Sequence, residues 1–110
     1  MSFAAARRHK GMSQRALEPE RLSFLGRRLA PGFVLRVVVV APGAQRAYSE
    51  AEWRDAIVVV EWGEIVLEPL TGRSYCFERG DVLWLQGLAL RALRNRGREP
   101  AVLVAVARRR

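Results

Sequence analysis

The stretch AIVVVEWGEIVLEPLTGRSYCFERGDVLWLQ, residues 56–86, decides the fold. It contains four short apolar runs, AIVVVE, EIVLE, SYCFE and VLWLQ, and the segments between them, WG, PLTG and RGD, hold residues typical of turns. Turn signals recur every ~8–12 residues, and no helical periodicity of useful length intervenes. This spacing predicts short antiparallel strands that form a sandwich or a barrel.

Apolar runs of the same kind flank this stretch. FVLRVVVV, residues 33–40, is a β-branched run long enough for a full strand, and LALRALR, residues 88–94, leads into the turn NRGREP. In the last run, AVLVAVA at residues 101–107, both alternating sets of side chains are apolar. We therefore expect the last strand to be covered on both faces, either between two sheets or at a subunit contact.

One segment between the predicted strands has two interpretations. In YSEAEW, residues 48–53, Ser49 is followed three residues later by Glu52. This spacing is that of a capping box, which would start one short helical turn. The same residues are equally compatible with a polar loop.

The length of 110 residues corresponds to one domain. Residues 1–22 show little periodicity, so we expect a flexible basic N-terminal arm there, with Met12 as an alternative start. A single β-barrel then covers residues 23–107, and residues 108–110 form a basic C-terminal tail. The chain is therefore predicted to be all-β with one folded body.

The net charge of +8 lies at the two ends of the chain. Residues 1–30 carry seven Lys or Arg against two Glu, and residues 108–110 are all Arg, whereas residues 31–107 carry nine Arg against nine acids. A phosphate-binding surface would concentrate its positive charge on the folded body itself. A nucleic-acid partner is therefore not expected for the folded body, although the basic ends leave docking to nucleic acid or to an acidic partner open.

Cysteine content and apolar runs indicate a cytoplasmic protein. Cys76 is the only cysteine, so no internal disulfide can form, and we expect its side chain to be an inert apolar filler. No apolar run approaches the ~20 residues that span a bilayer, and no secretory signal is visible. The Arg-rich start resembles a transit peptide, but it is also typical of a bacterial N-terminus, which is the interpretation we prefer.

Over about residues 33–107 the sequence resembles the cupin superfamily of small jelly-roll barrels. The second motif of that family is a Gly, five residues, Pro, one residue, Gly, two residues, His, three residues and Asn. Gly80 begins this motif here and Asn95 closes it. The places of Pro, the second Gly and His hold Gln86, Leu88 and Arg91. The first and last residues of the motif match the pattern of the family, whereas the three characteristic positions between them hold other residues.

The first cupin motif is looser. Its final Gly matches Gly63, and its acidic residue would fall one position out of register at Asp55. Its paired His would fall around Tyr48 and Glu50, or at Ser49 and Ala51. The resemblance thus implies a single-domain cupin-type jelly-roll barrel that lacks the metal-binding histidines.

These departures bear on metal binding and cofactors. A cupin metal site uses about three imidazoles and a carboxylate, whereas the only histidine here is His9, in the predicted arm. Glu50 and Asp55 alone would hold a hard cation only weakly. We predict a protein without metal or other cofactor, to which the common oxygenase chemistry of the family does not transfer.

The resemblance implies that Arg91 points into the barrel, where a guanidinium needs a partner. Three alternatives are open. In the first, Arg91 forms an internal ion pair with Glu50 or Asp55. In the second, its guanidinium has no partner within the protein and binds a carboxylate or phosphate of a ligand through two hydrogen bonds. In the third, a register shift places its side chain in solvent. We favour the internal pair.

Two functions are compatible with this site. The first is a metal-independent binding protein that holds a small organic molecule and acts as an accessory or regulatory module. The molecule is an anion if Arg91 binds it. The second is a metal-independent isomerase, epimerase, cyclase or decarboxylase, with catalytic candidates Glu50, Asp55, Arg91 and Tyr48. The ligand-binding candidates are Arg91, Glu50, Asp55, Tyr48, Trp62, Trp84 and Gln86.

Aromatic and apolar residues also suggest an assembly. Trp53, Trp62 and Trp84 could line a pocket for a planar ligand, but core or dimer contacts are the commoner role for such residues. The apolar faces of the first and last long strands exceed what one small barrel needs. We therefore expect a homodimer.

Overall fold

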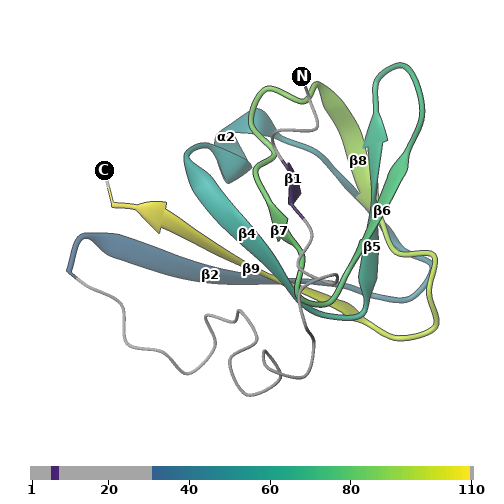
Figure 1. Ribbon diagram of the computed structural model, residues 1–110, viewed down its shortest axis with the longest axis horizontal. Coiled ribbons are helices and arrows are strands. Elements are labelled where there is room, and N and C mark those ends of the chain that lie inside the picture. Colours follow the sequence, from purple (N-terminus) through teal and green to yellow (C-terminus); the bar gives the residue numbers. More distant parts are fainter. Residues whose placement is uncertain (1–5, 8–30, 110) are drawn as a thin grey trace.

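The computed structural model describes residues 6–7 and 31–109, which form two facing antiparallel sheets (Figure 1). The five-stranded sheet has the order β1-β7-β4-β9-β2, and the four-stranded sheet has the order β3-β8-β5-β6. Apart from Ala6 and Arg7, the arm predicted over residues 1–22 lies outside the described residues. The elements are β1 (Ala6–Arg7), β2 (Phe33–Val40), β3 (Gln45–Ala47), α2 (Glu50–Trp53), β4 (Ala56–Trp62), β5 (Glu64–Pro69), β6 (Tyr75–Glu78), β7 (Val82–Leu83), β8 (Leu90–Arg94) and β9 (Ala101–Arg108).

The predicted all-β pattern is confirmed, and most of the predicted strands form where the apolar runs lie. The WG segment, however, does not join two paired strands, because β4 and β5 belong to different sheets. The run VLWLQ also differs from its prediction, since only Val82 and Leu83 are in a strand. The chain then turns at Gly87 and Ala89, which both have positive φ. This turn carries the chain to β8 in the other sheet.

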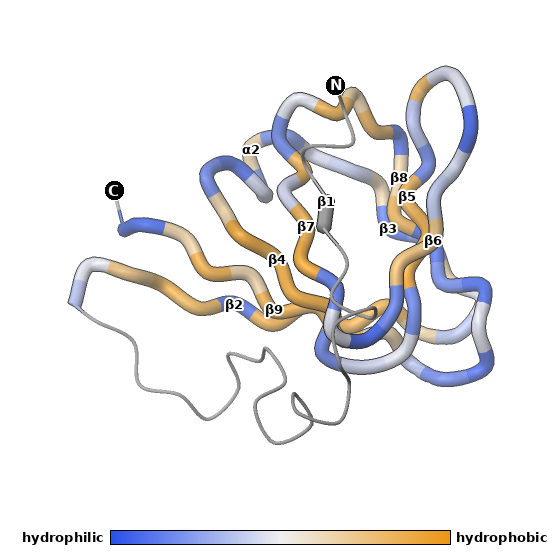
Figure 2. The backbone as a smooth tube through the Cα atoms, in the orientation of Figure 1, coloured by the Kyte–Doolittle hydropathy of each residue, from blue (hydrophilic) through white to orange (hydrophobic). Residues whose placement is uncertain are grey.

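The hydrophobic core fills the space between the two sheets. Alternate residues of the long strands point inward, so that Val58 and Val60 of β4 meet Leu67 of β5 and Leu93 of β8 in one buried cluster. Figure 2 shows the apolar stretches along β4 and β9. The largest fully buried side chain is Trp53, which enters the cluster from α2. The lumen of this barrel is therefore packed with side chains over most of its length.

β9 lies between β4 and β2 in the five-stranded sheet. Leu103 and Ala105 face the core, and Val104, on the opposite face, is also buried. Val102 and Val106 on that outer face are partly exposed. The prediction that both faces of this strand are covered is confirmed at its centre.

The helical interpretation of residues 48–53 is correct, but the capping box is wrong. α2 begins after Ser49, and Ser49 forms no side-chain cap hydrogen bond. The reason is that the Glu52 carboxylate is held by two arginines of the barrel instead of turning back to the helix start. α2 is a single turn, and in the described part of the chain no helix has the length and apolar character needed to cross a membrane.

Asn95 holds three chain segments together at the end of the barrel opposite α2. It is fully buried, and its side-chain amide donates to the carbonyls of Val40 at 2.9 Å and Glu99 at 2.7 Å. Its side-chain oxygen accepts from the Gly97 backbone N–H at 2.8 Å. These bonds satisfy buried polar groups and fix the β8–β9 turn against the end of β2. This role explains why an Asn closes the second motif.

Gly63 stands where the chain passes from one sheet to the other. Its φ is +74°, and a Cβ at this position would lie 2.5 Å from the Pro100 carbonyl oxygen. A side chain here would therefore meet both backbone strain and a clash with backbone atoms.

We expect Gly63→Ala to lower the free energy of unfolding by ~2–4 kcal/mol, which corresponds to a melting temperature roughly 10–25 °C lower. Gly72→Ala is the matched control, because Gly72 also has positive φ but has open space around it. It should show only the smaller cost of the backbone conformation. Equal losses in the two variants, measured by thermal denaturation, would show that contact with Pro100 does not matter.

Candidate functional site

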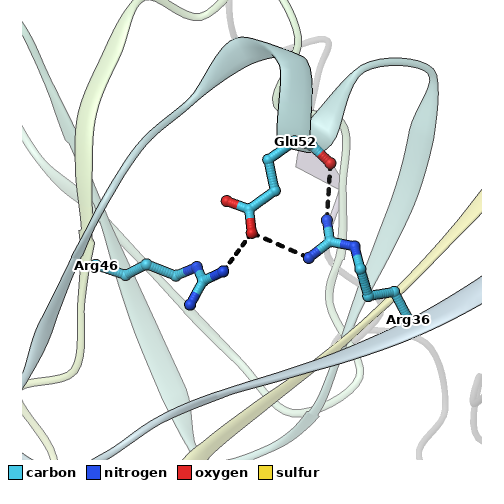
Figure 3. A network of polar contacts seen from close by, with 3 residues as sticks. All are labelled: Arg36, Arg46 and Glu52. Carbon is cyan, nitrogen blue, oxygen red and sulfur yellow. Dashed lines mark hydrogen bonds and ion pairs between the residues drawn. The ribbon is translucent and has the colours of Figure 1, made fainter.

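Three charged side chains meet between the sheets at the α2 end of the barrel (Figure 3). Arg36 of β2 donates from Nη1 to Glu52 Oε2 at 3.1 Å and from Nη2 to the Glu52 carbonyl at 2.7 Å. Arg46 of β3 donates from Nη2 to the same carboxylate oxygen. We call Arg36, Arg46 and Glu52 the arginine clasp. It joins one strand of each sheet to the helix.

Strand alternation aims both guanidinium groups inward. Arg36 pairs with Ala105 across the β2–β9 ladder and shares its face of β2 with the buried Val38 and Val40. Arg46 pairs with Leu93, another residue of the core cluster. The clasp is therefore built at inward positions of the barrel wall. Its side chains remain partly exposed, which places it at the mouth of the barrel.

The surrounding charges keep Glu52 ionised. Partial burial alone would raise the pKa of its carboxyl group, but the hydrogen bond and charge of Arg46 and the charge of Arg36 outweigh this effect. The pKa of Glu52 therefore lies below its ordinary value. The Trp53 indole adds a smaller lowering contribution, although its N–H forms no hydrogen bond of normal geometry with a described residue.

The clasp has more positive charge than its single carboxylate neutralises. The Arg36 guanidinium also stacks on Trp53, with Cζ 4.8 Å from the ring centroid. Nε of Arg46 is buried and has no hydrogen-bond partner among the described residues. A buried donor without an acceptor is costly in a folded protein. The site thus has one surplus cation and one open donor.

The structure places Arg91 differently from the position that the resemblance implied. Its side chain is exposed, and its Nη2 donates weakly to the Leu70 carbonyl at 3.4 Å. The favoured internal pair with Glu50 or Asp55 is not among the ion pairs formed by the described residues. The physical reason is a register irregularity, since Glu68 pairs with Ala92 but the next residue of β5 pairs with Leu90. Of the three alternatives, the structure agrees best with a register shift that places the Arg91 side chain in solvent.

Several other predicted site residues do lie near the α2 end. Tyr48 donates to Glu50 Oε1 at 2.7 Å and more weakly to the Leu85 carbonyl at 3.4 Å. The Gln86 side-chain oxygen accepts from the Asp55 backbone N–H at 2.8 Å. Burial, together with the hydrogen bond and charge of Glu50, raises the pKa of Tyr48 well above its ordinary value. Tyr48 is therefore a neutral hydrogen-bond donor at physiological pH.

The three tryptophans have different environments. Trp53 is fully buried and has the core position that is the commoner role of such residues. Trp62 and Trp84 are substantially exposed. Trp62 lies at the β4–β5 end of the barrel, away from the clasp, and lines an open pocket there. Cys76 is exposed and donates to Glu64 Oε1 at 3.5 Å, so the expectation that this side chain is an apolar filler is wrong.

The residues present do not fit the metal that the cupin fold often carries. The positions that the resemblance assigns to imidazoles hold Tyr48, Glu50 and Arg91, and Tyr48 and Glu50 bond to each other. Across residues 6–7 and 31–109, no group of three or more His, Cys, Asp or Glu is arranged to hold a metal ion. We therefore derive no chemical step through a metal.

Comparison with known proteins identifies the fold. No family model and no curated protein match the sequence. Solved structures do, among them the Cupin_2 domain of an XRE family transcriptional regulator from Enterobacter cloacae, with a TM-score of 0.53 and 23% identity over 68% of this chain and 79% of that chain. A Cupin 2 conserved barrel domain protein from Salinispora arenicola matches with a TM-score of 0.51 and 22% identity over 77% of this chain and 68% of that one.

A third match is Bacillus subtilis oxalate decarboxylase, with a TM-score of 0.53 and 21% identity. The match covers 71% of this chain and 22% of the enzyme. The two sheets and the packed lumen define a small jelly-roll barrel. The chain has the fold of the cupin superfamily, as the resemblance implied.

Sequence reasoning missed the arginine clasp. Arg91 drew attention as a charge within an apolar strand, and Arg36 meets the same criterion within FVLRVVVV. Arg36 alternates in step with Val38 and Val40, so its side chain is expected on the same face of the strand. This pattern could have identified Arg36 as an inward-facing charge. Glu52 was assigned to a helix cap, and no local pattern in the sequence connects it with residues on β2 and β3.

Glu52→Gln tests the electrostatic part of the clasp. Because the folded-state pKa of Glu52 is lowered, its ionised form stabilises the fold above the unfolded value near 4.5, and this contribution is lost as the pH falls through the folded pKa. We expect the variant to lose about 1 kcal/mol at pH 7, a modest value because both arginines are over a third exposed.

The difference between wild type and Glu52→Gln, measured by chemical denaturation, should shrink as the pH drops below the ordinary carboxyl range. Arg91→Gln, which removes an exposed guanidinium, should change stability at pH 7 by less than about 0.5 kcal/mol. A difference for Glu52→Gln that stays constant from pH 7 to pH 3 would contradict a charge-based role.

Proposed function

We propose that this chain is a metal-independent cupin-fold binding module that holds a small organic anion at the arginine clasp, as an accessory or regulatory protein of the cytoplasm. The observation that carries the proposal is the surplus positive charge of the two partly exposed guanidinium groups, beside the buried Arg46 Nε that has no acceptor among the described residues. A ligand carboxylate or phosphate supplies both the missing acceptor and the missing negative charge.

Residues next to the clasp give the ligand further contacts. Tyr48 and Arg46 are two residues apart in an extended segment, so both side chains face the mouth of the barrel. The Gln86 amide nitrogen can donate to polar groups of the ligand, and the Tyr48 oxygen, whose proton goes to Glu50, can accept from them. The Trp53 ring is fully buried beneath Arg36 and therefore supports this guanidinium from the core side. Arg36 and Arg46 thereby take the role that the sequence assigned to Arg91.

A binding function agrees better with the protonation states than an enzymatic one. The alternative enzyme needs a carboxylate poised as acid or base and Arg91 as an oxyanion partner. The candidate Arg91 is instead exposed and donates to the Leu70 carbonyl. The candidate Glu50 accepts the hydroxyl proton of Tyr48, whose raised pKa keeps this phenol protonated.

Native mass spectrometry of freshly purified protein tests the proposal. We expect no stoichiometric transition metal and an anionic organic mass bound to the wild type. Arg46→Gln should lose this mass, whereas Arg91→Gln, the matched change on an exposed guanidinium, should retain it. A thermal shift produced by small carboxylates should follow the same order, provided that circular dichroism shows both variants folded.

A stoichiometric metal would refute the metal-independent proposal. Equal retention of the ligand by Arg46→Gln and wild type would refute the clasp as its site. If no mass is retained and neither carboxylates nor inorganic phosphate shift the melting temperature, the anion-binding function is wrong.

We also propose that the protein is a homodimer. The outward face of β2 and β9 is apolar in register, with Val39 opposite Val102, Val37 opposite Val104 and Leu35 opposite Val106. Val37 and Val39 are 46% and 57% exposed. Apolar exposure of this kind along β2 is typical of an interface, while Val104 on the neighbouring strand is already buried.

The double variant Val37→Lys with Val39→Lys should be a monomer at micromolar concentration by size exclusion with light scattering, while the wild type is a dimer. Val34→Lys is the matched control, because Val34 is similarly exposed at 41% but points to the other face of β2. A wild-type protein that is already monomeric would refute the assembly.

A further inference from the structure

We propose that two copies of this chain pair edge to edge through β2, so that the five-stranded sheets of two barrels become one continuous sheet. This inference rests on the homodimer proposed above and names the contact that forms it. The exposed side chains of β2 and β9 indicate where an interface lies. The free backbone groups of β2 indicate how the second copy attaches.

β2 is the one long edge strand in the described part of the chain. The edges of the two sheets are β1, β2, β3 and β6, and Figure 1 shows β2 at the outer side of its sheet. β2 has eight residues, whereas β1, β3 and β6 have two, three and four. The unpaired N–H and C=O groups of a long apolar edge are a template for another strand. β2 is therefore the edge best suited to pair.

The hydrogen bonds around β9 show which backbone groups of β2 are free. The Arg109 N–H donates to the Gly32 carbonyl, and the β2–β9 register then continues without a shift along the whole of β2. Backbone groups of an antiparallel strand point alternately to its two sides. The even-numbered residues of β2 therefore bond to β9. The residues whose N–H and C=O groups point to the free edge are Phe33, Leu35, Val37 and Val39.

The other neighbour of β9 leads to the same assignment. The Val60 N–H donates to the Asp81 carbonyl, on the β7 side of β4, so the backbone groups of Val59 point to β9. Val59 pairs with Val104, whose backbone groups are therefore used by β4. The preceding residue of β9 then bonds to its partner Val38 on β2. No described residue hydrogen-bonds to the backbone groups at the free edge of β2.

The edge of β2 has none of the features that usually block pairing. Proteins protect an edge strand with Pro, with a bulge or with a charged side chain. β2 contains no Pro and no register shift, and its one charged residue, Arg36, points inward to Glu52. The most exposed residues of the strand are Val37 and Val39, whose backbone groups also point to the edge. The edge is therefore open to a partner along its length.

Symmetry and charge select one register. Two copies related by a two-fold axis pair antiparallel, and residues directly opposite each other lie on the same face of the sheet. A contact centred on Arg36 would set two guanidinium groups opposite each other, which is destabilising. A contact centred on Val37 places Arg36 opposite the partner's Val38. Leu35 then lies opposite the partner's Val39, and about six backbone hydrogen bonds join the strands.

A second copy fits this edge better than an unrelated strand. In the register centred on Val37, the outward side chains Leu35, Val37 and Val39 of both copies line up in pairs of apolar residues, which stabilise neighbouring strands. The two-fold axis supplies the backbone edge and the apolar row together, since both repeat in the partner. Arg36 lies one residue from the centre, so the arginine clasp of each copy adjoins the contact.

Amide hydrogen exchange of the full-length protein, followed by NMR, tests the edge pairing. At concentrations where light scattering shows a dimer, we expect the N–H groups of Leu35, Val37 and Val39 to exchange slowly, because carbonyls of the partner bind them. The amides of Arg36 and Val38, which bond to β9, are the internal control and should be protected in any folded state.

Two results separate this inference from the homodimer on which it rests. A dimer whose Leu35, Val37 and Val39 amides exchange as fast as those of an exposed loop would overturn the edge pairing and leave the homodimer standing. A wild type that is monomeric at every concentration would overturn the homodimer and the contact together.

Val37→Pro removes the central donor and keeps an apolar side chain, and it costs no bond of the β2–β9 ladder because this N–H points to the free edge. We expect the dimer Kd to rise on the order of tenfold to a hundredfold, as for two lost hydrogen bonds. The amides of Leu35 and Val39 should lose their protection, while those of Arg36 and Val38 keep it and show that the variant is folded.

Val37→Thr is the matched control, because it keeps the N–H and places a polar group on the outward face. Its dimer Kd should change by less than about tenfold. Equal weakening by Val37→Thr and Val37→Pro would show that the contact depends on side chains of the outward face and not on the edge. Protection of Leu35 and Val39 that persists in monomeric Val37→Pro would show that the edge is covered within one chain, which also overturns the proposal.

A dimer mixed from labelled and unlabelled chains tests the register. Arg36 and the partner's Val38 would form a pair without direct hydrogen bonds, with Cα atoms about 4.5 Å apart. We therefore expect an intermolecular NOE between their Hα protons. An NOE between the Hα protons of the two Arg36 residues would instead overturn the register centred on Val37.

Discussion

The arginine clasp is the interaction on which the α2 end of the barrel depends. β2 and β3 are consecutive in the chain but belong to different sheets, so no backbone ladder joins them. Glu52 takes a hydrogen bond from each, and Arg36 also holds the Glu52 carbonyl and covers Trp53 (Figure 3). The position of α2, and with it the Tyr48–Glu50 pair that flanks it, follows from these contacts. The same arginines provide the surplus positive charge that would attract the proposed anionic ligand.

This arrangement places positive charge in the barrel mouth by a different physical route from a metal. A bound cation gathers its ligands around one point and leaves an open coordination position for chemistry. A guanidinium is covalently attached, keeps its proton at all physiological pH values and directs donors along fixed lines. It can orient a carboxylate, but it offers no exchangeable coordination position. This property of the guanidinium is the basis of the proposed anion binding.

The sequence predicted the fold better than the site, and particular residues show why. Alternation and turn residues are local signals, and they located β2, β4, β5, β6 and β9. The lumen position of Arg91 depended on an unbroken register, which the irregularity beside Glu68 and Pro69 interrupts. The partners of Glu52 are 16 and 6 residues away on two strands. Such pairings arise from tertiary packing, which one sequence without relatives does not display.

The two ends of the barrel are held by different kinds of contact. The α2 end is held by the two guanidiniums and the one carboxylate of the clasp, whereas the β4–β5 end is held by the buried amide of Asn95 and the close approach of Gly63 to Pro100. β4, with seven residues, separates them by roughly 20 Å, more than twice the Debye length of ~8 Å at physiological ionic strength. The charge of a ligand at the clasp therefore acts only weakly on the β4–β5 end. Any coupling between them would have to pass through the packed strands, and the buried contacts of Asn95 and Gly63 make the β4–β5 end resistant to such movement.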